Sequence, residues 1–258
     1  MNVSPPAPDG PLLTLSGVGK SYNGDAPAVA DVNLSIERGS FVSLVGPSGC
    51  GKSTLLRLIA GLLQPSEGTL AWEDGDRPDD LGFVFQDATL LPWASAFDNV
   101  YLPLKLKGVS RDAASSKAHE ALARVGLGDV TDRLPRELSG GMRMRVSIAR
   151  ALVTEPPVLL MDEPFAALDE FTREKLDDDL LTLWRDLGWT VIFVTHSVYE
   201  SVYLSERILV MSTEAGPGQI EDDIRIDAPY PRGLAFRQSS AYFDHCKAVS
   251  AALRDGDI

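Results

Sequence analysis

Residues 46–53 have the types and the spacing that hold the phosphates of a nucleotide. They read Gly-Pro-Ser-Gly-Cys-Gly-Lys-Ser and fit the phosphate-loop pattern G-x-x-x-x-G-K-[ST]. Glycines let backbone N–H groups wrap around phosphate oxygens without clashes from Cβ atoms, and a following helix points its first N–H groups at the same anion. In this pattern Lys52 reaches the β- and γ-phosphates, and the Ser53 hydroxyl is a ligand of Mg²⁺. The residues that we expect to line the nucleotide site are Gly46, Pro47, Ser48, Gly49, Cys50, Gly51, Lys52, Ser53 and Thr54.

A pair of acids and a histidine follow two further apolar runs. Asp162 and Glu163 come directly after the run 158–161, and His196 comes directly after the run 191–195. Ligands of α/β folds bind at the carboxyl ends of parallel strands, where these side chains would meet the phosphates. We expect Asp162 to hold Mg²⁺ through water, Glu163 to polarise an attacking water, and His196 to approach the γ-phosphate. A strand with an acidic turn is the alternative interpretation of the pair on its own.

The elements that must position these residues follow an α/β pattern. Short apolar runs at 41–45, 158–161, 191–195 and 208–211 predict strands that are buried on both faces. Between them, leucines and related residues recur at helical spacing. The stripes are Leu55, Leu58, Ile59 and Leu62, then Met142, Val146, Ala149 and Val153 in 139–153, then Leu176, Leu180, Leu183 and Leu187 in 171–187. The alternation predicts a parallel sheet covered by helices.

Four segments differ in character along the chain. Residues 1–11 carry four prolines and predict a loose tail. Residues 92–153 show helical patterns and turn residues without a convincing strand, so we predict a helical subdomain inserted between core segments 12–91 and 154–235. Residues 236–258 predict a short helical C-terminal tail, with apolar contacts through Phe236, Phe243, Val249 and Leu253.

Composition narrows the classes of function. Among 258 residues, 24 are Lys or Arg and 37 are Asp or Glu, which gives a net charge of −13 and argues against a protein that holds nucleic acid through bulk charge. Two cysteines make no disulfide framework. We find no secretory signal and no apolar run long enough to span a bilayer, which favours a cytoplasmic location.

A second motif narrows the choice among nucleotide hydrolases. Leu138-Ser139-Gly140-Gly141-Met142 resembles the signature of the ATP-binding subunits of ABC transporters, and Ser139 precedes Asp162 by 23 residues, as in that family. The resemblance runs from about residue 12 to 235. It implies an α/β fold with a P-loop NTPase (RecA-like) core, an inserted helical subdomain and a small antiparallel β portion near the N-terminus. Met142 departs from the glutamine that is most common at its position.

The resemblance also implies roles for individual residues. Tyr22 resembles the aromatic residue that stacks on adenine, and Gln86 resembles the glutamine that senses Mg²⁺ and the attacking water. Asp169 resembles the aspartate of the loop that reaches the other subunit, and His196 resembles the switch histidine at the γ-phosphate. Ser139 is a good N-cap, so its hydroxyl and the N–H groups of Gly140 and Gly141 form an anion site at the start of a helix. In the family that site faces ATP held by a second subunit, so the resemblance implies a dimer that closes around ATP and Mg²⁺.

The function implied by the resemblance is ATP hydrolysis that powers a membrane importer. Leu90-Leu91-Pro92-Trp93 and Phe97-Asp98-Asn99-Val100 look like importers of the nitrate, sulfonate, taurine and thiamine-precursor group. The implied partners are a second copy of this chain, integral-membrane permease subunits and, indirectly, a solute-binding protein, which would hold the chain on the cytoplasmic face of the cell membrane. Two alternatives stay open: a soluble ABC-type ATPase in DNA repair or translation, and an ABC ATPase of lipid trafficking or export.

Overall fold

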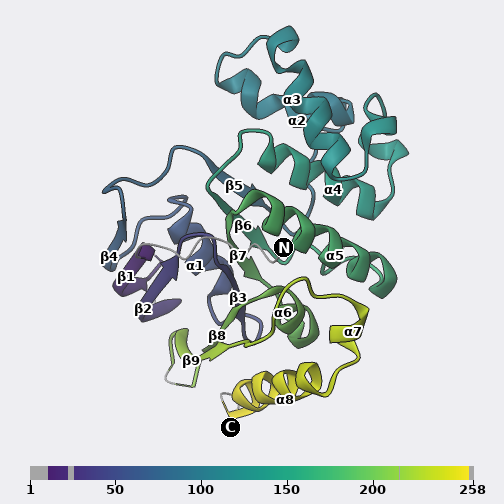
Figure 1. The fold of residues 1–258 in the computed structure, drawn as a ribbon. Helices are drawn as coiled ribbons and strands as arrows, with labels where there is room; N and C mark the ends of the chain where they lie inside the picture. The colour runs from purple at the N-terminus through teal and green to yellow at the C-terminus, as the bar shows by residue number, and fades with distance from the viewer. Residues whose placement is uncertain (1–10, 23–25, 215, 256–258) are drawn as a thin grey trace.

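The larger of two sheets carries the strand ends that the sequence links to chemistry. This computed structural model describes residues 11–22, 26–214 and 216–255 (Figure 1). The strand order is β5-β6-β7-β3-β8-β9, with every neighbouring pair parallel except β8 and β9. The strands are β3 (Phe41–Val45), β5 (Leu81–Val84), β6 (Val158–Asp162), β7 (Thr190–Val194), β8 (Arg207–Ser212) and β9 (Gln219–Arg225). The four strands predicted from apolar runs are confirmed to within one residue at each end, and every residue of β3, β6 and β7 is buried.

A small antiparallel sheet lies near the N-terminus, as predicted. Its order is β2-β1-β4, from β1 (Pro11–Lys20), β2 (Val29–Glu37) and β4 (Glu67–Trp72). The predicted tail is wrong at its last residue, because Pro11 is the first residue of β1, a position where a residue without an N–H is tolerated. The rest of that prediction, residues 1–10, lies outside the described residues.

Helix α1 (Lys52–Ile59) packs between the two sheets. Leu55, Leu56 and Ile59 share one apolar cluster with β1 and with one face of the large sheet. The predicted stripe is wrong at its fourth member: the helix ends at Ile59, and the side chain of Leu62 is 58% exposed. Gly61, at φ +69°, turns the chain out of the helix, which the apolar spacing alone could not reveal.

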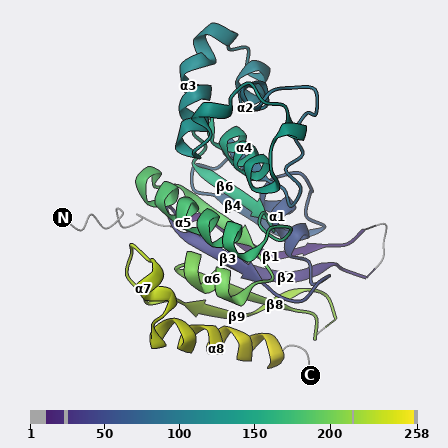
Figure 2. The same ribbon diagram turned by 90° about the vertical axis from the view of Figure 1, so that its right-hand side faces the viewer.

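Every regular element between β5 and β6 is helical, which agrees with the pattern seen in the sequence. The elements are α2 (Ala96–Leu106), α3 (Arg111–Arg124), the short 3₁₀ helices η1 (Gly128–Val130) and η2 (Pro135–Glu137), and α4 (Gly140–Leu152). Figures 1 and 2 show α2 and α3 at the end of the molecule farthest from α7 and α8, with α4 between them and the sheet. The exact division of the chain into core and subdomain stays a prediction.

The face of the sheet opposite α1 is covered by α5 (Glu170–Leu187) and α6 (Val198–Leu204). Beyond them lie α7 (Leu234–Arg237) and α8 (Ser240–Asp255), and α8 packs on α6 and β8. Val249 is fully buried as predicted, but Phe243 is 48% exposed and Tyr242 is buried in its place. The buried residues Tyr242, Cys246 and Val249 recur at i, i+4 and i+7, so the true apolar stripe of α8 is offset from the one that we predicted.

None of the helices in the described ranges has the length and apolar character needed to cross a bilayer.

Candidate functional site

The phosphate loop connects β3 to α1. At two of its positions, the surrounding atoms leave space for no residue larger than glycine. A Cβ on Gly51 would lie 2.3 Å from Val29 Cγ1, and the backbone there has φ +94°, in the region that favours glycine. A Cβ on Gly46 would lie 2.4 Å from the Met211 carbonyl oxygen. One side of the loop therefore packs closely against Val29 of β2 and Met211 of β8, and its opposite side is the one that can receive an anion.

Lys52 is the first residue of α1, and its ammonium lies inside the loop. Lys52 Nζ donates to the carbonyls of Gly46 and Pro47, each at 2.8 Å, and the residue is 5% exposed. The loop thus gathers a buried positive charge before any phosphate arrives. Cys50 is fully buried, with Sγ 3.8 Å from Lys52 Nζ, and burial raises the pKa of its thiol. A neutral buried thiol is a poor nucleophile, so Cys50 serves the loop as a small side chain.

Tyr22 lies beside the start of the same helix. Its hydroxyl is 3.3 Å from Thr54 Oγ1, and the ring is 40% exposed. Lys20 Nζ lies 5.6 Å from the centre of the ring. A half-exposed ring next to the phosphate loop fits the predicted stacking surface for a base.

Ser53 and Asp162 meet across the strand ends. Ser53 Oγ donates to Asp162 Oδ1 at 2.7 Å, although β3 and β6 are separated in the sheet by β7. Asp162 is 7% exposed. A hydroxyl and a carboxylate are the hard oxygen donors that Mg²⁺ takes, so this pair fits the predicted metal. No group of three or more His, Cys, Asp or Glu residues that could hold a metal occurs in the described part of the chain.

Glu163 and His196 form a second pair at the same edge. His196 Nδ1 lies 3.4 Å from Glu163 Oε2, with the side chains 56% and 24% exposed respectively. Glu163 has φ +48°, a conformation that costs a residue with a side chain about 1 kcal/mol or more. The surrounding structure holds it there, because the Glu163 N–H donates to the Val194 carbonyl at 3.0 Å. Backbone strain of this kind is typical of functional sites, where it fixes the direction of a side chain, here the Glu163 carboxylate.

Gln86 lies two residues beyond the end of β5, the strand next to β6. Its side chain is exposed. Its predicted contacts with Mg²⁺ and the attacking water stay a prediction.

The signature residues lead into α4, with Leu138 and Gly141 buried and the two residues between them at the surface. Ser139 is the N-cap of α4, its Oγ accepts from the Met142 N–H at 3.3 Å, and Ser139 and Gly140 are exposed. Gly141 is buried against α5, where a Cβ would lie 2.8 Å from Thr172 Cγ2. The side chain of Ser139 therefore caps its own helix, while the outward side of the motif is open.

Asp169 lies next to this motif. It is the N-cap of α5, and its Oδ1 accepts from the Thr172 N–H at 2.9 Å, a hydrogen bond that holds the pKa of the Asp169 carboxyl below its usual range. Thr172 thus touches both the Asp169 loop and Gly141. The two segments that the resemblance assigns to a neighbouring subunit share one surface of this chain.

Two residues that the sequence analysis passed over lie directly behind the site. Glu200 is 5% exposed and accepts a hydrogen bond from Thr195, the residue before His196. Arg173 donates to the carbonyls of Phe165 and Leu168 in the loop between Glu163 and Asp169. Glu200 carried a sequence signal, since a glutamate inside a short, largely apolar helix has to find a partner.

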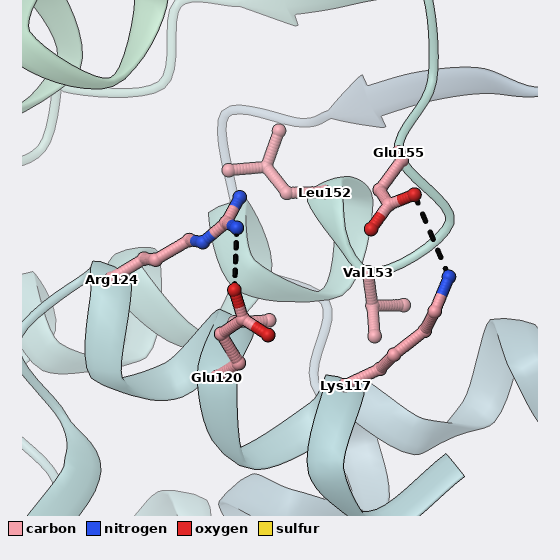
Figure 3. Close-up of a pocket in the computed structure, with 7 residues that line it drawn as sticks. Lys117, Glu120, Arg124, Leu152, Val153 and Glu155 are labelled. Atoms are coloured by element: carbon pink, nitrogen blue, oxygen red, sulfur yellow. Dashed lines mark hydrogen bonds and ion pairs between the residues drawn. The ribbon is translucent and has the colours of Figure 1, made fainter. Parts of the chain in front are cut away.

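A small hollow between α3 and the end of α4 is not an alternative nucleotide site. Its volume is about 20 Å³, roughly that of one water molecule. Its charges are paired with each other, Arg124 with Glu120 at 2.6 Å and Lys117 with Glu155 at 3.5 Å (Figure 3). With little space and paired charges, it has nothing to offer a nucleotide.

A comparison with known protein families identifies the family of this chain. The ABC transporter family matches residues 29–166, more than half of the chain. The chain belongs to the ABC transporter family. The match includes the phosphate loop, the signature motif, Asp162 and Glu163, and the predictions of an ABC ATP-binding subunit and of an ABC-family ATPase are confirmed.

Individual ABC proteins and solved structures agree. The chain is 42% identical to the taurine import ATP-binding protein TauB of Yersinia pestis bv. Antiqua (strain Antiqua), over 93% of this chain and 91% of that protein. It is 47% identical to the aliphatic sulfonates import ATP-binding protein SsuB of Rhodopseudomonas palustris (strain BisA53), over 85% of this chain and 76% of that protein. A dimeric bacterial ABC transporter cassette has a TM-score of 0.73 and 37% identity over 84% of this chain and all of that chain. CbiO1 of Clostridium perfringens has a TM-score of 0.77 and 25% identity over 96% of this chain and 99% of that chain. The predicted fold class is confirmed by these ABC structures.

Proposed function

We propose that this chain is the ATP-hydrolysing, energy-coupling subunit of a membrane importer for a small organic solute or anion. The observation that carries the proposal is the meeting of Lys52, the Ser53–Asp162 pair and the Glu163–His196 pair at one edge of the parallel sheet. A module that only binds nucleotide has no need of the second pair.

The side chains divide the work of phosphoryl transfer to water. Lys52, freed from the loop carbonyls, neutralises the β- and γ-phosphates of the substrate ATP. Ser53 and Asp162 would hold Mg²⁺, which supplies charge neutralisation when it is bound. Glu163 orients and polarises the attacking water, and His196 contacts the γ-phosphate and keeps the Glu163 carboxylate in position.

The second half of each ATP site would come from another copy of the chain. Support comes from the exposed start of α4, where Ser139, Gly140 and the neighbouring Asp169 loop share one open surface. The first N–H groups of α4 give that surface a partial positive charge that suits a phosphate. A cassette with a TM-score of 0.73 to this chain is dimeric, and a post-hydrolysis structure of the same cassette, at 36% identity, is bound to ADP and Pi.

The import direction and the class of cargo rest on similar proteins and on one exposed surface. The two import proteins described above are named for taurine and for aliphatic sulfonates. Beyond β5, Trp93 is 75% exposed and Gln86 is exposed, which leaves an aromatic side chain available to a permease. We place the working chain on the cytoplasmic face of the membrane, held by permease subunits and served by a solute-binding protein.

Two experiments test the proposal. The first is co-purification from detergent-solubilised membranes: recovery of a polytopic permease supports the importer, whereas recovery of ribosomal or DNA-bound proteins without a permease would favour a soluble ABC ATPase. The second is ATP turnover by the Glu163→Gln variant. We expect this variant to bind ATP as the parent does, to lose at least about 99% of turnover and to accumulate as a closed dimer. Undiminished turnover would remove Glu163 from its role.

A further inference from the structure

We propose that Glu200 and Arg173 are positioning residues: Glu200 locks the His196 segment in place, and Arg173 locks the Glu163–Asp169 loop in place. This inference rests on the proposed hydrolytic function. It assigns to the two residues the task of fixing the distance between Glu163 and His196, without contact with ATP.

The His196 side of the lock is a closed set of hydrogen bonds. The Thr195 hydroxyl donates to Glu200 Oε2, the Ser197 N–H donates to Thr195 Oγ1 at 3.0 Å, and the Glu200 N–H donates to Ser197 Oγ at 3.3 Å. Both neighbours of His196 are therefore tied to Glu200, at the first turn of α6. Only the His196 side chain is left free to face the site, at 56% exposure.

The Glu163 side of the lock is held by Arg173 on α5. Its guanidinium donates to the Phe165 carbonyl at 3.3 Å and to the Leu168 carbonyl at 2.9 Å. These carbonyls lie in the short loop that starts at Glu163 and ends at Asp169. Because Glu163 sits in a strained conformation at φ +48°, the loop needs such outside support to keep its carboxylate aimed at His196.

The Glu200 carboxyl also lies in the electrostatic environment of the site. Burial raises the pKa of the Glu200 carboxyl, and the Thr195 hydroxyl, Arg173 and His196 oppose that rise, while Glu163 adds to it. The charges that surround Glu200 are therefore those of the site itself. Glu200 Oε1 has no hydrogen-bond partner among the described groups, so Thr195 holds the carboxyl through one oxygen alone.

The test measures kcat, KM for ATP and the unfolding temperature of the full chain with five single substitutions and the double variant Thr195→Val/Glu200→Ala. Thr195→Val keeps the shape of the side chain and removes the donor, and Thr195→Ser restores the donor. Glu200→Ala removes the acceptor, and Arg173→Met removes the guanidinium that holds the Phe165 and Leu168 carbonyls. Glu206→Gln is the control: Glu206 is a half-buried carboxyl that accepts from the backbone N–H of Phe41, at the opposite end of β3.

We expect Thr195→Val, Glu200→Ala and Arg173→Met to lower kcat roughly ten- to a hundredfold, because misplacement of catalytic groups by about 1 Å costs that much. KM and the unfolding temperature should stay near those of the parent, and Thr195→Ser and Glu206→Gln should turn over like the parent. The Thr195→Val/Glu200→Ala double variant should be no worse than either single one, because both changes break the same hydrogen bond. Parental kcat in Thr195→Val and Glu200→Ala would overturn the role of Glu200, and parental kcat in Arg173→Met would overturn that of Arg173. A loss that follows the unfolding temperature or is shared by Glu206→Gln would overturn both. Absence of hydrolysis by the parent chain, with permease present, would instead overturn the proposed function.

Discussion

The strand-end site and the start of α4 both suit a phosphate, but a single chain completes only one of them. At the strand ends, Lys52 is held by its own phosphate loop, and Ser53 and Glu163 each have a partner from another segment of the same chain. At α4, the hydroxyl of Ser139 binds only the first turn of its own helix, and the motif faces outward. The phosphate site at the strand ends is thus complete within one chain, whereas the phosphate site at the start of α4 still needs a second half.

The difference teaches how binding and turnover can be separated. The prebuilt region needs no second chain to take up ATP, so damage there should remove binding. The open region meets ATP only after two chains close, so damage there should spare binding and remove turnover. The predictions below are ordered by their expected effect on turnover.

Lys52→Ala should have the largest effect. The loss of a charge-assisted contact with phosphate costs roughly 3 kcal/mol, so we expect ATP affinity to fall about a hundredfold and turnover to disappear. A nucleotide titration of the isolated chain measures this, with the exposed Lys105→Ala on α2 as control. ATP affinity equal to that of the parent would contradict the assignment of the phosphate loop.

Ser139→Arg should be nearly as harmful to turnover while leaving affinity alone. The large cation blocks the outward side of the motif, so turnover should fall at least tenfold, with ATP affinity of the single chain within about twofold of the parent. The matched control is Ser110→Arg, because Ser110 caps α3 in the same way, its Oγ accepting from the Ala113 N–H. Equal loss of turnover in both variants would mean that Ser139 only stabilises a helix.

Gly141→Ala should have an intermediate effect. Its added methyl group would lie 2.8 Å from Thr172 Cγ2 and must push α4 from α5, at a cost of about 1–3 kcal/mol of stability. Thr172→Ser, which removes the opposing methyl group, should restore part of the loss. At Gly140 a Cβ would meet Leu168 Cδ2 at an ordinary 3.5 Å, so Gly140→Ala should keep the stability of the parent in thermal unfolding. Equal stability of the two alanine variants would contradict this packing.

Asp177→Asn should leave turnover unchanged and alter only the pH dependence of stability. Burial raises the pKa of Asp177 to about 9, although Arg237 lies 3.6 Å away. The native chain then keeps a proton that the unfolded chain releases above about pH 4, so the stability contributed by this group is lost as pH rises toward 9, by up to about 1.4 kcal/mol per pH unit.

Asparagine has no proton to lose, so Asp177→Asn should gain stability over the parent between pH 6 and pH 8. Denaturant unfolding at both pH values measures the gain, with the exposed Asp186→Asn as control. The same pH dependence in parent and Asp177→Asn would show that Asp177 is ionised in the native state.

Some of this architecture was predictable from the sequence because it is local in the chain. The phosphate loop, the strand ends at Asp162 and Val194 and the cap at Ser139 each depend on a few neighbouring residues, and the sequence predicts them to within one residue. Leu62 and Phe243 were assigned wrongly because a spacing pattern does not show where a helix ends or which of its faces meets the core. The roles of Arg173 and Glu200 were missed for another reason. A glutamate in a largely apolar helix indicates that Glu200 needs a partner, but the sequence does not show that this partner is Thr195, nor that Arg173 turns back onto the Phe165 and Leu168 carbonyls.

The most direct test of the central claim is to mix two inactive variants. One chain carries Lys52→Ala and keeps Ser139, and the other carries Ser139→Arg and keeps Lys52. If ATP is completed across two chains, the mixed dimer regains one intact site, and the mixture should recover a substantial part of the parent's turnover while each variant alone stays inactive. A mixture as inactive as its components, or a Ser139→Arg chain that turns over ATP like the parent, would contradict a site shared between two copies.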